Sequence, residues 1–274
     1  MTTTRVCVAG ITGKVGRGLA RAIASSGDLE LVGAVARSAA GRTVEDALGV
    51  AGGTGAPVRI TGTVGEALAT PCDVLVDYTR ADAVRAHVLA AVERGVHVVV
   101  GTSGLSDGDY HAIDEAARAS GVGVFAAGNF AITAVLLADF AERAAKHLPS
   151  WEIVDYAYEA KPDAPSGTAR ELASRLERVR APHLARPVGE TLGERAARGA
   201  TLGGAQLHSV RLPGFVSSVE VCFGLPGERL TLRHDSVDPT APYVGGTLLA
   251  VRRVRELRGV VRGLGTLLGL DRPA

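Results

Sequence analysis

The sequence predicts an α/β protein with a Rossmann-type doubly wound parallel sheet and a second α+β domain with a mixed sheet. In the first half of the chain, short β-branched runs alternate with helical patterns, which is typical of βαβ units. The turn after the first of these runs is rich in glycine. In the second half, three strand-like runs follow one another without helices between them, which predicts antiparallel or mixed pairing.

The first domain is expected to contain five strands and their connecting helices. The expected strands are Arg5–Ala9, Leu29–Ala36, Asp73–Asp77, Val96–Val100 and Val122–Ala126. The expected helices are Val15–Ser25, Ala81–Glu93 and Asp107–Ser120. Because parallel strands need crossover connections, this order indicates a sheet that is covered on both faces.

The pattern changes near Gly128, where the second domain is expected to begin. A helix at Ile132–His147 leads into the run Trp151–Glu159, the turn-rich Lys161–Gly167 and a helix from about Thr168 to Val179. The three consecutive strand-like runs are Ala205–Arg211, Ser218–Phe223 and Arg229–Arg233. The last segment, Gly245–Leu270, is read as helical and apolar enough to pack back on the first domain. The expected domains are therefore residues 1–128 with 241–274, and residues 129–240.

Composition excludes several classes of protein. The 274-residue chain has a formal net charge of +1, so we expect neither nucleic acid nor an anionic membrane as a partner. We expect no signal peptide, because the residues after Met1 contain no long apolar run, and no apolar run of the chain reaches the roughly 18 residues of a spanning helix. Cys7, Cys72 and Cys222 are scattered without a CxxC spacing, which fits a reducing cytoplasm. No cluster has metal-ligand spacing, so no metal is expected.

The glycine-rich segment between the first strand and the first helix is a candidate dinucleotide site. Gly10 permits a tight turn, Gly13 lets the backbone approach a pyrophosphate, and Gly16 allows close packing of helix on strand. The helix N-terminus offers free N–H groups and a partial positive charge to the phosphates. A purely structural turn is the alternative. The candidate residues here are Gly10, Thr12, Gly13, Lys14, Val15 and Gly16.

The end of the second strand bears on the choice of cofactor. NAD-binding proteins place an Asp or Glu there to bind the ribose 2′-hydroxyl, whereas this chain has Arg37 followed by Ser38. Both side chains suit a 2′-phosphate. The sequence thus favours NADPH, with NADH left open and an ordinary exposed arginine as the alternative.

Two further loops follow the carboxyl ends of strands, where open α/β sheets bind their ligands. Tyr78 and Thr79 follow the third strand, and Gly101, Thr102 and Ser103 follow the fourth. Each loop alone is compatible with ordinary turn chemistry. Together with the glycine loop they indicate a cofactor site at one edge of the sheet.

The segment Lys161–Thr168 is the least generic in the chain. Ser166 and Thr168 can cap the following helix, and Gly167 permits a close approach. An anion at this helix N-terminus would meet backbone N–H groups, two hydroxyls and the ammonium of Lys161. We therefore predict a carboxylate site, with a plain N-cap turn as the alternative.

At this segment the chain resembles dihydrodipicolinate reductase, the lysine-pathway enzyme also called 4-hydroxy-tetrahydrodipicolinate reductase, and the Asp163–Thr168 run is highly specific to that family. The resemblance spans nearly the whole chain, through Gly10–Gly16, Asp73–Arg80, Gly101–Gly104, Ala126–Phe130, Lys161–Thr168, His208–Arg211 and Gly227–His234. It implies a dinucleotide-binding first domain and a second domain for substrate binding and homotetramer formation. It also implies hydride transfer to a cyclic α,β-unsaturated imine dicarboxylate.

By this resemblance, Asn129 and Phe130 join the cofactor-binding residues, and Lys161, Ser166, Gly167 and Thr168 bind a substrate carboxylate. Two departures stand out. Where the family has a His-His-Arg-His run, with one histidine proposed as the general acid, this chain has Ala157–Ala160. The stretch Asp235–Pro239 replaces one that usually ends in a substrate-facing arginine. Lys161 or Tyr158 would then have to supply the proton.

Three hypotheses follow. Our preferred interpretation is an NAD(P)H-dependent reductase of a different cyclic imine or enamine carboxylate, because the substrate side has changed while the cofactor loop is intact. The second is a genuine 4-hydroxy-tetrahydrodipicolinate reductase with a remodelled acid. The third is a non-catalytic NADP(H)-binding regulatory subunit, which would have no need of the carboxylate site at Lys161.

Overall fold

The computed structural model describes residues 3–50 and 57–270, which form two compact units. The first unit contains the described residues up to Ile132 and those from Thr240 onward, and the second is Thr133–Pro239. Asn129 and Phe130 thus fall in the first unit, although the sequence-based boundary at 128/129 assigned them to the second domain.

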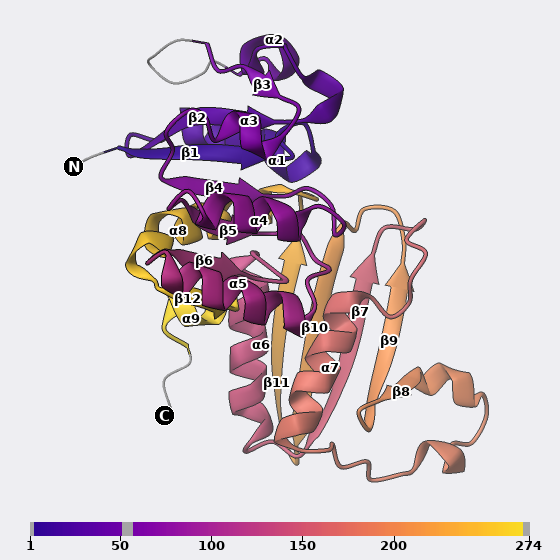
Figure 1. Cartoon of the computed structure of the whole chain (residues 1–274). Coiled ribbons are helices and arrows are strands. Elements are labelled where there is room, and N and C mark those ends of the chain that lie inside the picture. Colours follow the sequence, from indigo (N-terminus) through magenta and orange to yellow (C-terminus); the bar gives the residue numbers. More distant parts are fainter. Residues whose placement is uncertain (1–2, 51–56, 271–274) are drawn as a thin grey trace. The chain divides into compact units, whose positions relative to one another are not determined.

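The first unit is built on a parallel sheet of seven strands in the order β12-β6-β5-β4-β1-β2-β3 (Figure 1). Every neighbouring pair is parallel, which confirms the predicted Rossmann-type sheet. The strands are β1 (Thr4–Ala9), β2 (Leu29–Val35), β3 (Ile60–Thr61), β4 (Val74–Asp77), β5 (His97–Val100), β6 (Gly123–Ala126) and β12 (Gly259–Arg262).

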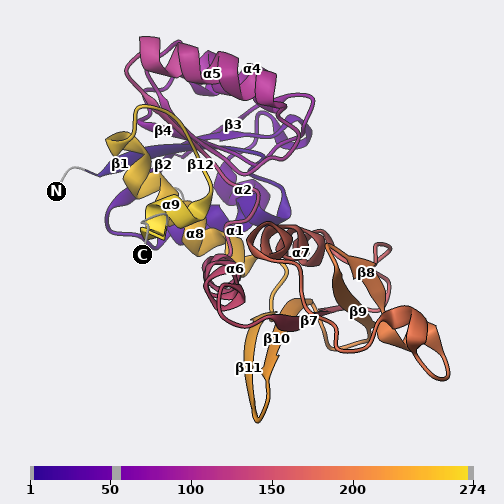
Figure 2. The ribbon, with the colours of Figure 1, turned by 90° about the horizontal axis from the view of Figure 1, so that it is seen from below.

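Helices lie on both faces of this sheet, as Figure 2 shows, with α4 and α5 on one face and α1 and α8 on the other. The longer helices are α1 (Lys14–Ala24), α4 (Val84–Val92), α5 (Asp107–Ala119) and α8 (Ala241–Arg253). The short ones are α2 (Val44–Leu48), α3 (Val64–Ala67) and α9 (Leu264–Leu268). The core under α4 and α5 joins strand residues such as Leu75 and Val98 to Val88 and Ile113.

The prediction of a continuous helix over Gly245–Leu270 is wrong. Helix α8 ends at Arg253, and after a 3₁₀ turn the chain forms β12, which pairs in parallel with β6. Two glycines with positive φ bracket the strand, Gly259 at 71° and Gly263 at 87°, and both break the helical path. Between them the β-branched Val260 and Val261 favour an extended chain.

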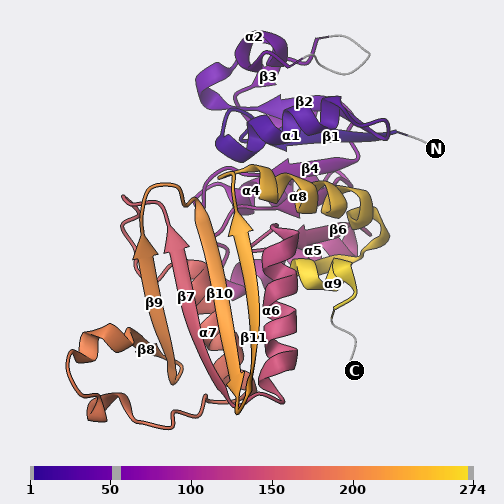
Figure 3. The ribbon, with the colours of Figure 1, turned by 180° about the vertical axis from the view of Figure 1, so that it is seen from behind.

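The second unit contains a five-stranded sheet in the order β11-β10-β7-β9-β8. Its strands are β7 (Ser150–Ala157), β8 (Ala200–Leu202), β9 (Ala205–Arg211), β10 (Ser217–Leu225) and β11 (Glu228–Ser236). The pair β7 and β9 is parallel and the other pairs are antiparallel, which confirms the predicted mixed sheet. Helices α6 (Ile132–Ala145) and α7 (Gly167–Val179) pack on one face, and Figure 3 shows the other face.

Strand β7 is the central strand of this sheet, and its side chains alternate between the helix-covered core and the opposite face. Trp151 and Ile153 enter the core with Leu176 of α7 and Phe223 of β10. Asp155 occupies the next inward position and is also buried. A carboxylate therefore occupies a position that the alternation of β7 assigns to the core, two residues before the strand ends.

None of the helices within residues 3–50 and 57–270 combines the length and the apolar character that crossing a bilayer requires.

Candidate active site

The glycine loop between β1 and α1 is tied to the neighbouring strand. The N–H groups of Gly10 and Ile11 both donate to the carbonyl of Val35, at 2.9 and 3.2 Å. Gly10 has φ of 85°, and a Cβ there would lie 2.3 Å from the carbonyl oxygen of Tyr78. A Cβ at Gly16 would lie 2.2 Å from the carbonyl oxygen of Gly10. Gly16 thus packs the helix against the loop backbone rather than against the strand.

The first turn of α1 is open to an anion. The helix begins at Lys14, Gly13 is the N-cap without a side-chain cap, and the turn holds no acidic residue. The first helical hydrogen bond runs from the N–H of Arg17 to the carbonyl of Gly13, at 3.0 Å. The N–H groups of Lys14, Val15 and Gly16 precede that bond and so remain available, as at any helix start. These residues fit the pyrophosphate of a dinucleotide.

Arg37 and Ser38 directly follow the point where the glycine loop meets β2. That strand ends at Val35, the residue whose carbonyl accepts the two loop N–H groups. Both side chains are exposed in the short 3₁₀ turn Arg37–Ala39. No carboxylate stands between Ala36 and Ala40. This end of β2 can therefore present a guanidinium and a hydroxyl to a ligand.

The loops after β4 and β5 pack against each other through Tyr78. A Cβ at Gly101 would lie 2.2 Å from the Tyr78 ring, so that ring covers the glycine. The Tyr78 hydroxyl lies 2.7 Å from Oγ1 of Thr247 in α8, and its ring centroid lies 6.1 Å from that of Phe130. Burial raises the pKa of Tyr78 above its usual range. Its side chain therefore shapes the loop and is kept neutral.

The remaining predicted cofactor residues differ in their surroundings. The hydroxyls of Thr79 and Thr102 both point at the carboxylate of Asp77, at 2.8 and 2.7 Å. Ser103 is exposed. Asn129 accepts the N–H of Ala131 through its side-chain oxygen at 2.8 Å, and Phe130 is buried. The buried side chain of Phe130 is therefore closed to a ligand.

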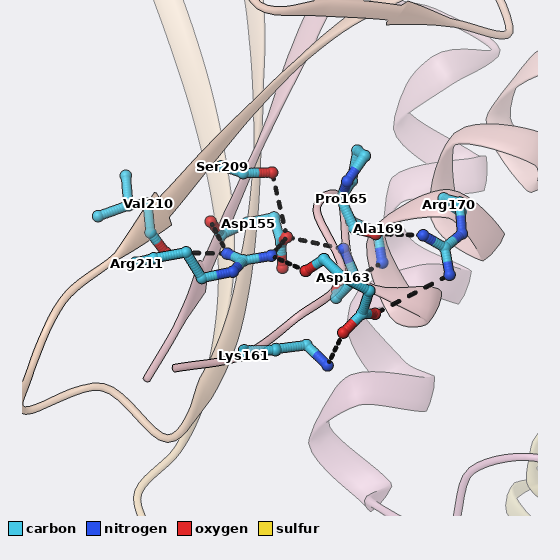
Figure 4. A network of polar contacts seen from close by, with 10 residues as sticks. Asp155, Lys161, Asp163, Pro165, Ala169, Arg170, Ser209, Val210 and Arg211 are labelled. Carbon is cyan, nitrogen blue, oxygen red and sulfur yellow. Dashed lines mark hydrogen bonds and ion pairs between the residues drawn. The ribbon is translucent and has the colours of Figure 1, made fainter. Parts of the chain in front are cut away.

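Figure 4 shows the turn of the second unit that carries the predicted substrate residues. The ammonium of Lys161 lies 2.6 Å from Oδ1 of Asp163, and this hydrogen bond lowers the pKa of the Asp163 carboxyl. Arg170 lies 3.9 Å from the other carboxylate oxygen and also donates to the carbonyl of Pro165. The Ala164–Pro165 bond is cis. Lys161 is thus held at the turn by a carboxylate of the chain itself.

Helix α7 starts at Gly167 with Ser166 as its N-cap. The Ser166 hydroxyl accepts the N–H of Ala169 at 3.3 Å, as predicted for a cap. Its backbone N–H is used differently, because it donates to Asp155 at 2.8 Å. Gly167 is exposed and Thr168 is half-buried, and the first turn of α7 contains no acidic residue. The N–H groups of Gly167 and Thr168 therefore start a helix that can receive an anion.

Two side chains that the sequence analysis missed hold this turn, Asp155 and Arg211. Asp155 is 1% exposed, and its Oδ2 accepts from Ser166 N–H at 2.8 Å, Ser209 hydroxyl at 3.3 Å and Arg211 Nη2 at 2.7 Å. The same Arg211 nitrogen donates to the carbonyl of Asp163 at 2.8 Å. Figure 4 shows how this pair connects β7 and β9 to the turn. The inward position of Asp155 in β7 is the one signal that could have identified it.

The positions of the missing histidines are occupied by small or exposed side chains. Ala157 is the last residue of β7 and is buried, and Tyr158 directly follows the strand with 47% of its surface exposed. The carbonyl of Tyr158 accepts the N–H of Lys161 at 3.1 Å. Two histidines elsewhere in this unit have other partners: His234 lies 2.8 Å from Thr133 Oγ1, and His208 lies 2.8 Å from Glu152.

In the part of the chain that the structure describes, no group of three or more His, Cys, Asp or Glu side chains is arranged to hold a metal ion. The starts of α1 and α7, neither of which has an acidic residue in its first turn, can each receive an anion.

Comparison with known proteins identifies the class and the family. A Rossmann-type parallel sheet with an open glycine loop is typical of dinucleotide-binding proteins, and relatives named as reductases make this chain an NAD(P)H-dependent oxidoreductase. Residues 4–130 match the model of the dihydrodipicolinate reductase N-terminus, and residues 133–268 match that of its C-terminus. The chain belongs to the dihydrodipicolinate reductase family.

Relatives that align over nearly the whole chain support its membership of this family. A protein of Moorella thermoacetica called 4-hydroxy-tetrahydrodipicolinate reductase is 40% identical over 268 residues, covering 97% of this chain and 98% of the relative. A protein of the same name from Desulfitobacterium hafniense is 38% identical over 270 residues, covering 98% and 100%. The dipicolinate-bound dihydrodipicolinate reductase of Paenisporosarcina sp. TG-14 has a TM-score of 0.85 at 30% identity, covering 97% of this chain and 99% of that one.

Proposed function

We propose that this chain is a genuine 4-hydroxy-tetrahydrodipicolinate reductase of lysine and diaminopimelate biosynthesis. The observation that carries the proposal is the retained turn Lys161–Thr168, which carries an ammonium paired with Asp163 and leads into the start of α7. Relatives that bear this name and align over nearly the full chain favour this function over our initial preference for a redirected reductase. Because those relatives are named as enzymes, they also speak against a non-catalytic subunit.

The first unit would bind the cofactor. The residues that would hold it are the loop Gly10–Gly16, the pair Arg37 and Ser38, the loops at Tyr78–Thr79 and Gly101–Ser103, and the backbone at Asn129–Phe130. When bound, reduced nicotinamide supplies the hydride of the reaction. The Arg37 guanidinium and the Ser38 hydroxyl favour NADPH, because both can contact a 2′-phosphate. NADH is the alternative cofactor.

The second unit would bind the substrate. Lys161, Ser166, Gly167 and Thr168 would hold a carboxylate through the ammonium, the hydroxyls and the N–H groups at the start of α7. The Lys161–Asp163 contact of 2.6 Å holds the ammonium at the turn that precedes this helix. Hydride addition must be balanced by a proton, and Lys161 or Tyr158 would donate it, because an ammonium and a phenol are both hydrogen-bond donors.

A second candidate function rests on one observation, the absence of histidine from Ala157–Ala160. Each lost charge-assisted contact to a second carboxylate would cost about 1.5–3 kcal/mol of binding free energy. A cyclic imine with a single carboxylate would not incur this loss. This candidate predicts that such a substrate is reduced faster than the dicarboxylate.

We further propose that the protein is a cytoplasmic homotetramer without nucleic-acid or membrane partners. Helices α6 and α7 pack on one face of the five-stranded sheet, and no described helix of that unit covers the other (Figure 3). Such a face is available for a second copy of the chain. Light scattering of the purified protein measures the assembly directly, and a monomer at micromolar concentration would contradict this part of the proposal.

The function is tested by following NADPH oxidation with 4-hydroxy-tetrahydrodipicolinate that is generated in situ. We expect turnover that depends on this substrate and that is lost in Lys161→Ala. NADPH binding without any turnover would contradict the proposal, and cyclic imine monocarboxylates would then be the substrates to examine.

A further inference from the structure

The carboxylate of Asp77 lies at the centre of the edge where the cofactor loops meet. Asp77 is the last residue of β4, which pairs with β1 on one side and β5 on the other. It is in register with Ala9 at the end of β1 and with Val100 at the end of β5. The next residues along those strands are Gly10 and Gly101, so three loops leave the sheet around this one side chain.

This carboxylate is fully buried and receives four hydrogen bonds. Its Oδ1 accepts from the Thr79 N–H at 3.0 Å, the Thr79 hydroxyl at 2.8 Å and the Thr102 hydroxyl at 2.7 Å. Its Oδ2 accepts from Nδ1 of His87 in α4, at 2.8 Å. Asp77 is 0% exposed. Each carboxylate oxygen offers about two lone-pair sites, so Oδ1 is saturated while Oδ2 depends on the single bond from His87.

The balance of these effects keeps Asp77 ionised. Burial by itself raises the pKa of Asp77, but the hydrogen bonds from His87, Thr102 and Thr79 outweigh it and the pKa lies below its usual range. An apolar side chain would suit the rest of this strand, since Val74, Leu75 and Val76 are all fully buried. The position therefore holds a charge where packing alone does not require one.

The partners of Asp77 explain what the charge does. Thr79 belongs to the loop after β4 and Thr102 to the loop after β5, and the two hydroxyls meet on the same oxygen. The spacing between the loops is therefore set by two short bonds to one atom. His87 donates to the other oxygen and so fixes the direction in which the carboxylate points.

We propose that Asp77 and His87 are positioning residues of the cofactor site, which hold the loops at Thr79 and Thr102 at the spacing that the nicotinamide half of the cofactor requires. This inference rests on the proposed function, since it assumes that these loops bind NADPH. Without the His87 donor, the buried carboxylate must turn to another donor or admit water, and both loops move with it. The effect appears in cofactor affinity, although neither residue needs to touch the cofactor.

The chain offers a matched control for His87. His97 lies in the same unit at the amino end of β5, on the opposite edge of the sheet, and is likewise partly buried. Its Nδ1 accepts the N–H of Gly123 at 2.9 Å. Replacing His87 by alanine removes the Nδ1 bond to Asp77, and replacing His97 removes the Nδ1 bond to Gly123, but only His87 adjoins the cofactor loops.

The test is a titration of the full-length protein with NADPH, read by nucleotide fluorescence, for the wild type, His87→Ala, His87→Asn and His97→Ala. We expect His87→Ala to raise the Kd for NADPH at least tenfold, which corresponds to about 1.4 kcal/mol. His97→Ala should leave the Kd for NADPH within about twofold of the wild-type value, which is clearly smaller than the tenfold rise expected for His87→Ala. His87→Asn should recover most of the affinity, because its side-chain N–H can replace Nδ1.

The outcomes separate this inference from the proposed function. A wild type that binds neither NADPH nor NADH overturns the proposed function. If the wild type binds NADPH and His87→Ala binds it equally well, the positioning role is wrong while the function stands. Equal losses in His87→Ala and His97→Ala, or no recovery in His87→Asn, would reduce His87 to a general stabilising residue and overturn the inference.

Discussion

The buried ion pair of Arg211 with Asp155 makes the sharpest prediction on stability. Replacing Arg211 by methionine preserves much of the aliphatic stem but leaves the Asp155 carboxylate, 1% exposed, with only the Ser166 N–H and the more distant Ser209 hydroxyl. Removing one partner of a buried ion pair costs about 3–5 kcal/mol, because the other charge stays buried and uncompensated. We expect Arg211→Met to lower the free energy of unfolding of the second unit by that amount.

A control and a double variant define the origin of this loss. Arg175 forms a two-bond ion pair with Glu142 in the same unit, at 2.8 Å for each bond, but both side chains are 28% exposed. Arg175→Met should therefore cost only about 1 kcal/mol. Asp155→Asn combined with Arg211→Met removes the buried charge, so we expect it to recover at least about 1 kcal/mol relative to Arg211→Met alone.

The assay is urea denaturation followed by tryptophan fluorescence. The chain has a single tryptophan, Trp151, which lies in the core of the second unit, so the signal reports that unit. The free energy of unfolding is obtained by linear extrapolation. If Arg211→Met costs no more than Arg175→Met, or if the double variant is no more stable than Arg211→Met, the pair does not stabilise the turn as described.

Three further predictions concern the two sites and the effect of pH. Lys161→Ala should lower kcat/KM at least about 100-fold, which is the lower end of what a proton donor contributes to the rate. The Kd for NADPH should stay unchanged. Loss of NADPH binding would contradict the assignment of Lys161 to the substrate site. Gly13→Val should weaken NADPH binding by obstructing the approach of a pyrophosphate, and leave the unfolding of the second unit as seen by Trp151 unchanged; unaltered NADPH affinity would count against the glycine loop as the phosphate site. Burial lowers the pKa of His234, so the folded state takes up this proton at a lower pH than the unfolded chain, which takes it up below about pH 6.5. The free energy of unfolding of the second unit should therefore fall as the pH drops below that value, by at most about 1.4 kcal/mol per pH unit for this histidine. In urea titrations between roughly pH 5 and 7, His234→Gln should make this free energy depend less on pH. An unchanged pH dependence in His234→Gln would contradict the role of His234.

Much of the fold could be predicted because local patterns encode it. The alternation of β-branched runs with helices identified the parallel sheet, and consecutive strands identified the mixed one. Strand β12 was missed because its apolar residues also fit a helix, and only the positive φ at Gly259 and Gly263 decides between the two. Strand β3, with two residues, is too short to carry a pattern.

The residues of the candidate site likewise fall into those that could be predicted from the sequence and those that could not. The glycine loop and the Lys161–Thr168 turn are contiguous in sequence, so their chemistry is visible in the residue types. Asp77 and Asp155 were not recognised, because part of each hydrogen-bond network comes from far along the chain: Thr102 is 25 residues from Asp77, and Arg211 is 56 from Asp155. Each acid stands where the strand pattern predicts an apolar residue, Asp77 at the end of β4 and Asp155 at a core-facing position of β7. An acid at such a position is the sequence feature that indicates a buried hydrogen-bond network.

The measurement that tests the central claim most directly is a comparison of kcat/KM for two substrates with NADPH. One substrate is 4-hydroxy-tetrahydrodipicolinate, and the other is a cyclic imine that carries a single carboxylate. A genuine family enzyme should prefer the dicarboxylate by at least about tenfold, the equivalent of one charge-assisted contact of roughly 1.4 kcal/mol. Equal rates, or a preference for the monocarboxylate, would contradict the account and assign the chain to a redirected imine reductase.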